Sequence, residues 1–262
     1  MTKQKRPVAV VTGGRQGLGR GCAMALAARG FDLVLIDLHE DDTARQTVAD
    51  LQAAGAQVAF LQGDLANIDG HADLAQAAWD AFGGIDCLVN NAGVAPMGLS
   101  DVLTLSPEAY DFNTGINLRG TFFLAQAVAR LMVAAGKTDA YRSMIFITSI
   151  AANHVSVAIP EYCISKAALS MVSGLFALTL AEQGIHVHEV RPGFIRTAMT
   201  TEGEGSPTEA IEAHIAAGHV PQNRWGEEQD VGRTVATMAA GDLPFTVAHP
   251  VYVDGGYGIR TA

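Results

Sequence analysis

The stretch at residues 12–19, TGGRQGLG, decides the fold of this chain. It follows the apolar run PVAVV at 7–11 and leads into an apolar helical segment, so the glycines stand between an expected strand and an expected helix. Gly13 permits a tight turn, Gly17 lets a phosphate approach the backbone, and Gly19 allows the helix to pack closely on the strand. The free N–H groups at the start of such a helix attract phosphate. A glycine-rich string alone is weak evidence, and a plain turn is the alternative, but this context predicts a dinucleotide-binding loop.

Short β-rich runs alternate with longer helical stretches along the rest of the chain. Strands are predicted over 7–11, 32–37, 57–62, 85–90, 144–149, 185–190 and 250–254, and helices over 17–28, 41–54, 68–82, 106–135 and 161–182. Strands separated by helices of this length imply right-handed βαβ crossovers and a mostly parallel sheet. The sequence therefore predicts one α/β domain over 1–262, a Rossmann-like doubly wound sheet of about seven strands with helices on both faces.

Composition excludes several classes of function. A net charge of −10 argues against a nucleic-acid partner, which needs a basic surface. The chain shows neither a signal peptide at its start nor an apolar run long enough for a membrane span, so we expect a soluble cytoplasmic protein. The three cysteines are far apart and form no CxxC pair, which predicts neither a disulfide framework nor a metal site.

An acidic residue ends the second predicted strand, 18 positions after Gly19. Asp37 can accept hydrogen bonds from the ribose hydroxyls of an adenosine and would repel a 2′-phosphate, so it favours NAD over NADP. A helix N-cap is the alternative role for Asp37. Arg15 in the loop weakens the argument, because a basic side chain could reach a phosphate. Asp64 follows the third strand and could bind the adenine amino group, or could simply be a turn acid.

Further motifs follow the loop in a fixed order, and together they resemble a classical short-chain dehydrogenase/reductase. These markers are NNAG at 90–93, Asn117, Ser149, Tyr162-x-x-x-Lys166, and Pro192-Gly193 followed by Thr197. They cover nearly the whole chain, and the chain is similar in general to those named 3-oxoacyl-[acyl-carrier-protein] reductases. The resemblance implies a single domain that binds NAD(P), a small carbonyl or alcohol substrate, and a homotetramer or a dimer.

The chemistry of the marked residues agrees with this resemblance. Tyr162 and Lys166 are four positions apart, so on a helix they share a face, and a nearby ammonium lowers the high pKa of a tyrosine. Tyr162 would then exchange a proton with the substrate oxygen, Ser149 would hydrogen-bond the same oxygen, and Asn117 would hold a water that relays protons to Lys166. Taken singly, each residue is more often a surface or turn residue.

The resemblance also implies the cofactor contacts. These are Gly13, Arg15, Gln16, Gly17, Leu18, Gly19, Asp37, Asp64, Leu65, Asn91, Ala92, Gly93, Tyr162, Lys166, Pro192, Gly193, Ile195 and Thr197. The expected reaction is hydride transfer between NAD(H) and a ketone or secondary alcohol. The sequence leaves the substrate open, because Asp37 argues against an NADPH-dependent acyl reductase and makes a sugar, polyol or hydroxy-acid dehydrogenase an alternative. A catalytically silent nucleotide sensor on the same fold is an alternative from another class.

Several segments depart from the family pattern or fall outside it. The irregular stretch 198–226 is predicted as a mobile substrate lid containing a short helix capped at Ser206, Pro207 and Glu209, with an ordinary surface loop as the alternative. The segment 134–143 is expected to extend a surface loop away from the nicotinamide. His188-Glu189 stands where many relatives carry an asparagine, and His186 with His188 shares one face of a strand without a third ligand that would indicate a metal.

Overall fold

Seven parallel strands form one sheet in the order β3-β2-β1-β4-β5-β6-β7. The computed structural model describes residues 6–202 and 206–259. The strands are β1 Val8–Thr12, β2 Asp32–Asp37, β3 Val58–Gln62, β4 Cys87–Asn90, β5 Arg142–Ile147, β6 Ile185–Pro192 and β7 Pro250–Val253. The chain leaves β1 for β2 on one side and returns to β4 on the other, which is the topology predicted from the alternating pattern. Ligands bind such sheets beyond the carboxyl ends of the strands at this reversal.

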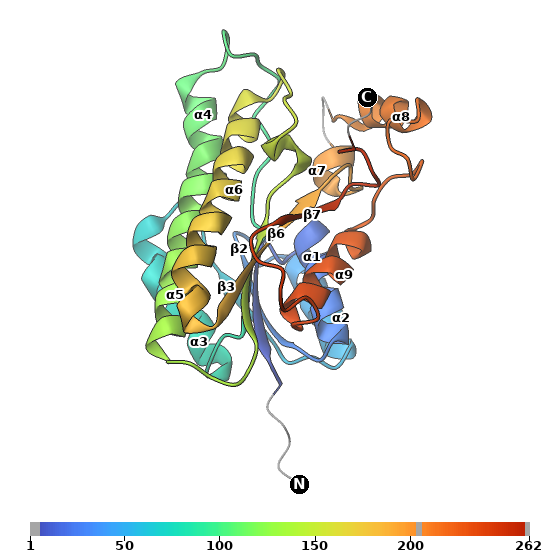
Figure 1. Cartoon of the computed structure of the whole chain (residues 1–262). Helices are drawn as coiled ribbons and strands as arrows, with labels where there is room; N and C mark the ends of the chain where they lie inside the picture. The colour runs from blue at the N-terminus through green and yellow to red at the C-terminus, as the bar shows by residue number, and fades with distance from the viewer. Residues whose placement is uncertain (1–5, 203–205, 260–262) are drawn as a thin grey trace.

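Helices cover both faces of the sheet (Figure 1). The α-helices are α1 Gly17–Ala28, α2 Asp42–Ala53, α3 His71–Phe82, α4 Pro107–Thr114, α5 Thr121–Ala134, α6 Pro160–Leu180, α7 Ala198–Thr201, α8 Thr208–Ala216 and α9 Glu228–Ala239. Short helical turns occur at η1 Ile68–Gly70, η2 Gly115–Gly120, η3 Ile150–Ala152 and η4 Ala181–Gln183. Helices α3, α5 and α6 pack on one face, and α1, α2 and α9 pack on the other.

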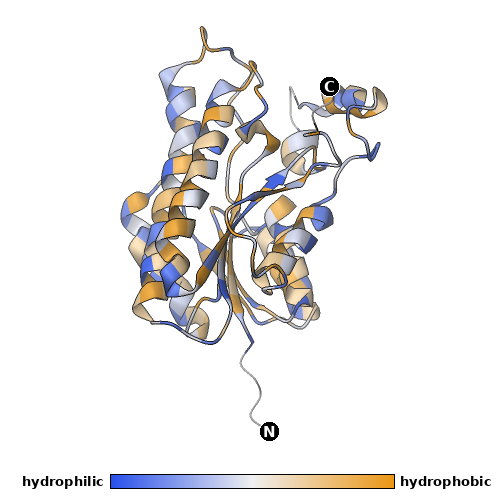
Figure 2. Cartoon of the chain, in the orientation of Figure 1, coloured by the Kyte–Doolittle hydropathy of each residue, from blue (hydrophilic) through white to orange (hydrophobic). Residues whose placement is uncertain are grey.

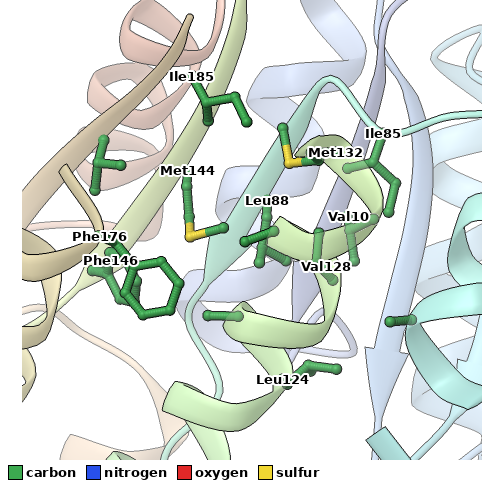
Figure 3. Packing of buried hydrophobic residues seen from close by; sticks show 14 of the residues in the cluster. Val10, Ile85, Leu88, Leu124, Val128, Met132, Met144, Phe146, Phe176 and Ile185 are labelled. Carbon is green, nitrogen blue, oxygen red and sulfur yellow. The ribbon is translucent and has the colours of Figure 1, made fainter. Parts of the chain in front are cut away.

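Two apolar cores lie on opposite sides of the sheet because successive strand residues point to opposite faces. In β1, Val8 and Val10 join the core beneath α3, α5 and α6, which Figure 3 shows in part, whereas Ala9 and Val11 join the core beneath α1 and α9. Because both faces are covered, the strands are continuously apolar, as buried parallel strands usually are. Figure 2 shows that the surrounding helices mix polar and apolar residues.

The helix predicted over 106–135 is wrong as a single element. Ser106 does cap its start, because its Oγ accepts a hydrogen bond from the Ala109 N–H at 3.2 Å. The helix then changes at Gly115–Gly120 into a π-helical segment, η2, before α5 begins. Asn117 lies in this segment and is fully buried. Insertions of this kind are frequent at functional sites, and hydrophobic periodicity does not reveal them.

Other boundaries also differ from the predictions. Ser206 does not cap α8; the helix begins at Thr208, whose hydroxyl instead donates to the Thr200 carbonyl at 2.9 Å and ties α8 to α7. Part of the predicted lid, 203–205, lies outside the described residues. Helix α9 was missed by the sequence reading, although Val231, Val235 and Met238 repeat at helical spacing. Strand β5 ends at Ile147, before the predicted end at 149.

Helix α6 and the turn that follows it, Pro160–Gln183, are long and apolar enough to cross a membrane, but almost half of that stretch is buried against the sheet and neighbouring helices. It is therefore the long core helix of the domain.

The expected surface loop at 134–143 includes Tyr141, just before β5. The Tyr141 ring stacks on His186, and its hydroxyl lies 2.9 Å from His188 Nε2.

Candidate active site

The glycine-rich loop after β1 forms a close-packed cradle. Gly13 and Gly17 have positive φ values of 66° and 58°, a region that other residues rarely adopt. A Cβ on Gly19 would lie 1.9 Å from the Gly13 carbonyl oxygen, so only glycine fits there. Gln16 precedes α1 and provides no side-chain cap, which leaves the first N–H groups of the helix for a ligand. These features fit the pyrophosphate of a dinucleotide.

Acidic side chains surround Arg15 at the end of β2. The Asp37 carboxylate accepts hydrogen bonds from the backbone N–H groups of Arg15, at 3.1 Å, and Leu38, at 2.9 Å. The Arg15 guanidinium lies 3.7 Å from Asp37 and 2.5 Å from Asp41. The N-cap of α2 is Asp41, whose Oδ1 accepts from the Ala44 N–H, and so Asp37 does not cap this helix. Asp37 is thus held at the cleft edge and Arg15 is neutralised.

The segment after β4 is anchored to the same loop. Asn91 Nδ2 donates to the carbonyls of Thr12, at 2.9 Å, and Gly13, at 3.3 Å. The Thr12 hydroxyl in turn accepts from the N–H groups of Asn91 and Ala92, each at 3.0 Å. This asparagine therefore holds the carboxyl ends of β1 and β4 together, and Gly93, two residues later, lines the cleft.

The predicted catalytic residues lie close to one another, and two of them lie beside Gly93. A Cβ on Gly93 would lie 3.0 Å from Asn117 Oδ1 and 3.7 Å from Lys166 Nζ. Lys166 Nζ donates to the Ile147 carbonyl at 3.1 Å and lies 5.7 Å from the centre of the Tyr162 ring. Ser149 follows β5 and lines the cleft together with Tyr162 and Lys166. Residues distant in sequence therefore meet at one point because the ends of β4 and β5 face the start of α6.

Asn117 occupies a different position from the other three. Its Oδ1 accepts from the Val94 N–H at 2.7 Å, and its Nδ2 donates to the Val94 carbonyl at 3.0 Å and to Asn113 Oδ1 at 3.1 Å. The side chain is therefore fully engaged and does not line the cleft. A proton relay through Asn117 would have to use its backbone, which η2 holds in π-helical geometry.

Burial changes the acidity of the two central groups. It lowers the pKa of Lys166 to about 8, because a charged ammonium is poorly solvated there. Burial also raises the pKa of Tyr162, while a hydrogen bond with the Ser149 side chain opposes that rise. Near neutral pH, Lys166 is therefore largely protonated and Tyr162 carries its proton, which makes the hydroxyl a proton donor beside a cation.

The remaining predicted cofactor residues border the same cleft. Asp64 forms a turn by accepting from the Ala66 N–H at 2.8 Å. Gly193 donates its N–H to the Val253 carbonyl at 2.9 Å, which places the segment after β6 against β7. The cleft has a volume of about 410 Å³, and every predicted cofactor residue except Gly19 lines it. Sequence reasoning missed other lining residues, namely Ile36, Leu38, His39, Gly63, Val94, Ile116, Ile147, Thr148, Ala198, Met199 and Thr200.

Aromatic and imidazole rings gather around Tyr257, outside the residues that line the cleft. Tyr257 lies 4.6 Å from Phe194, 5.6 Å from His154 and 6.0 Å from His214, measured between ring centres. His214 Nδ1 also lies 2.8 Å from His219 Nδ1. Phe194 stands between Gly193 and Ile195, which both line the cleft, so this ring cluster adjoins the cleft. The five residues come from four separate segments, and only the fold reveals them as a group.

The fold and these groups define the class: a dinucleotide-binding α/β oxidoreductase, in which a glycine-rich phosphate cradle and a Ser, Tyr and Lys set line one cleft. Comparison with known proteins makes the class specific. A family model described as Enoyl-(Acyl carrier protein) reductase matches residues 13–258.

Solved and curated relatives match over almost the whole chain. The crystal structure of a 3-oxoacyl-[acyl-carrier protein] reductase from Brucella melitensis in complex with NAD is 45% identical, with a TM-score of 0.94 and coverage of 99% of this chain and 100% of that one. A 3-oxoacyl-[acyl-carrier-protein] reductase from Synechocystis is 32% identical, covering 98% of each chain. The 2-dehydro-3-deoxy-D-gluconate 5-dehydrogenase of Escherichia coli is also 32% identical, covering 97% of this chain and 96% of the relative.

The chain belongs to the short-chain dehydrogenase/reductase family. It is an oxidoreductase that uses NAD(P) and acts on CH–OH or C=O groups of small molecules. The family assignment made from the ordered sequence markers is thereby confirmed, as is the seven-stranded doubly wound fold.

Proposed function

We propose that this protein transfers a hydride between NAD(H) and a ketone or secondary alcohol, using Ser149, Tyr162, Lys166 and Asn117. The observation that carries the proposal is that Ser149, Tyr162 and Lys166 line one cleft with the glycine cradle, while Asn117 lies behind Gly93. A nicotinamide bound between them would supply or accept the hydride. The chain itself would orient the substrate oxygen and move its proton.

In this proposal, Tyr162 is the group that exchanges a proton with the substrate oxygen. The Lys166 ammonium donates to the Ile147 carbonyl, which holds its Nζ 5.7 Å from the centre of the Tyr162 ring. There it stabilises the phenolate that forms in carbonyl reduction. Ser149 hydrogen-bonds the same oxygen and opposes the rise in the Tyr162 pKa. The Asn117 side chain holds the Val94 backbone. Its own backbone carbonyl, in the π-helical turn, would be the hydrogen-bond acceptor of a proton relay.

NAD(H) is the cofactor that the loop favours over NADP(H). Asp37 keeps a carboxylate at the cleft edge, where it can accept from ribose hydroxyls and repel a 2′-phosphate. Arg15, which sequence reasoning left as the opposing argument, is neutralised by Asp37 and Asp41. We expect kcat/KM to be higher with NADH than with NADPH; equal or higher efficiency with NADPH would contradict this assignment.

Two substrate classes are consistent with the family, and the ring cluster bears on the choice. Relatives named 3-oxoacyl-[acyl-carrier-protein] reductases make a 3-oxoacyl ketone the first candidate. The rings of His154, Phe194, His214 and Tyr257 combine flat faces with imidazole and hydroxyl groups, a surface suited to a sugar, polyol or hydroxy acid. This observation supports the second candidate, in line with relatives named as sugar-acid and polyol dehydrogenases.

The segment 198–226 fits a substrate lid in its described parts. Met199 and Thr200 in α7 line the cleft, and Thr208 ties α8 to α7. His214 of α8 stacks on Phe194 beside the nicotinamide position, with ring centres 5.9 Å apart. Movement of α7 and α8 together would therefore open or cover the substrate position.

A homotetramer, or a dimer, is the proposed assembly. Ile164, Met171, Leu175 and Leu178 form an exposed apolar stripe along α6, and exposed Phe123 lies on the neighbouring helix α5. Apolar surface of this kind is usually covered by a partner. Light scattering coupled to size exclusion should give a mass of two or four chains.

The central test removes one hydroxyl. Tyr162→Phe should lower kcat at least about 100-fold on any active substrate of a ketone and alcohol panel, because the proton donor is lost while the ring is kept. Tyr110→Phe, at an exposed tyrosine of α4, is the matched control and should keep wild-type turnover. Near-normal turnover by Tyr162→Phe would refute the mechanism, and NADH binding with no turnover on any panel member would favour a nucleotide sensor.

A further inference from the structure

Two oppositely charged side chains are buried together near the carboxyl end of β6, the strand next to the edge strand β7. Glu189 and Arg191 lie on the same face of β6, and their exposed fractions are 1% and 9%. Arg191 Nε donates to Glu189 Oε1 at 2.6 Å. Neither residue lines the cleft, and the chemistry described above gives them no part.

Hydroxyl groups from two other elements complete the carboxylate side of the pair. Thr148 Oγ1 donates to Glu189 Oε1 at 2.8 Å, immediately after β5. Ser170 Oγ donates to Oε2 at 2.9 Å, and Ser173 Oγ lies 3.3 Å from the same oxygen, both on α6. Glu189 therefore connects the end of β5 to α6.

The guanidinium side extends the network to β7 and to the turn after Ser149. Arg191 Nη2 donates to Ser170 Oγ at 2.7 Å, and Nη1 donates to the Tyr252 hydroxyl at 2.8 Å. The same hydroxyl accepts from Asn153 Nδ2 at 2.8 Å. One ion pair thus joins β6, β7, α6 and both chain segments that flank Ser149.

The attachment points lie next to the catalytic groups in the chain. Thr148 stands between Ile147, whose carbonyl holds Lys166 Nζ at 3.1 Å, and Ser149. Ser170 is one helical turn beyond Lys166 on α6. Any shift of α6 against the end of β5 would change the relation of Lys166 and Tyr162 to Ser149, and the network opposes that shift.

We propose that the Glu189–Arg191 pair is a positioning unit, which fixes α6 against the end of β5 so that Tyr162 and Lys166 keep their relation to Ser149. A buried ion pair is weak evidence for stability, since apolar residues of similar size often stabilise as well. A fully satisfied polar network does define one geometry. The inference rests on the proposed function, because that function assigns the groups being positioned.

The test measures the ionisation of Tyr162 directly. Tyrosinate absorbance is titrated with pH in each background with and without Tyr162→Phe, and the difference isolates Tyr162 among the five tyrosines. We expect Glu189→Gln to move the Tyr162 midpoint upward by at least about half a pH unit, because a Ser149 hydroxyl displaced from Tyr162 no longer opposes the rise in its pKa. On an active substrate, kcat should fall about tenfold or more with NADH affinity changed less than about threefold.

Two further variants separate positioning from stability. Glu189→Leu with Arg191→Met removes both charges, so its Tm should recover relative to Glu189→Gln, while the shifted Tyr162 midpoint remains. Arg142→Met is the control: Arg142 is buried at the other end of β5 and donates to the carbonyls of Met132, at 2.7 Å, and Gln183, at 3.1 Å. It should lower Tm and leave the Tyr162 midpoint unchanged.

The outcomes distinguish this inference from the proposed function. A lowered Tm with a wild-type Tyr162 midpoint in both Glu189 variants overturns positioning and leaves a structural role. Absence of turnover by the wild-type protein on every substrate would instead count against the proposed function, while the titration, which needs no substrate, would still decide the positioning of Tyr162 and Lys166.

Discussion

Gly19→Ala is the substitution whose effect the structure defines most sharply. The added Cβ would lie 1.9 Å from the Gly13 carbonyl oxygen and 2.7 Å from Asn91 Nδ2, although Cβ contacts below 3.0 Å are essentially never seen. The two sides of the loop must therefore separate by more than about 1 Å. Gly13 cannot move freely, because its N–H donates to the Ile36 carbonyl at 2.8 Å.

Separating the two sides of the loop should lower both the stability of the fold and the affinity for NADH. Overpacking of this kind costs about 1–3 kcal/mol, which for a chain of this length lowers Tm by roughly 3–10 °C. A 1 Å displacement of binding groups costs up to about 100-fold in function, so we expect NADH affinity to fall roughly 30- to 100-fold.

NADH fluorescence titration and thermal unfolding measure the two effects of Gly19→Ala. Gly98→Ala is the matched control, because Gly98 is exposed, has open space around its Cβ position and lies outside the cradle. It should keep wild-type affinity and Tm. If Gly19→Ala lowered Tm but bound NADH within threefold of wild type, the loop would be a structural turn and the pyrophosphate assignment would be refuted.

Two other residues give separate predictions. Asp37→Ser should raise the NADPH-to-NADH ratio of kcat/KM by roughly five- to thirtyfold, because removing one charge near a phosphate is worth about 1–2 kcal/mol. An unchanged ratio in steady-state kinetics would mean that Asp37 does not select the cofactor. Burial lowers the pKa of Lys166 from 10.5 to about 8, so between these pH values the unfolded chain holds a proton that the folded chain lacks, and wild-type stability rises with pH. The free energy of unfolding of Lys166→Met, measured in urea and relative to wild type, should therefore fall by about 3 kcal/mol between pH 7 and pH 10.5. An equal change of stability with pH in the two proteins would contradict this.

Local sequence was sufficient for features that depend on neighbouring residues. The glycine spacing after β1 and the four-residue spacing of Tyr162 and Lys166 act within one turn or one helix, so they could be predicted from position alone. Apolar runs separated by helices likewise predicted the parallel sheet, since each crossover allows few topologies. The errors fell where local pattern is ambiguous, as at the π-helical turn around Asn117 and at the start of α8.

The sequence by itself determined the fold and the family, because these follow from residue types at fixed spacing. Only the tertiary structure decided which charges meet. Arg15 is neutralised by Asp41, Glu189 is buried against Arg191, and the rings of His154 and His214 gather around Tyr257. These contacts join residues on separate elements, so they depend on how strands and helices pack in space, which periodicity along the chain does not encode.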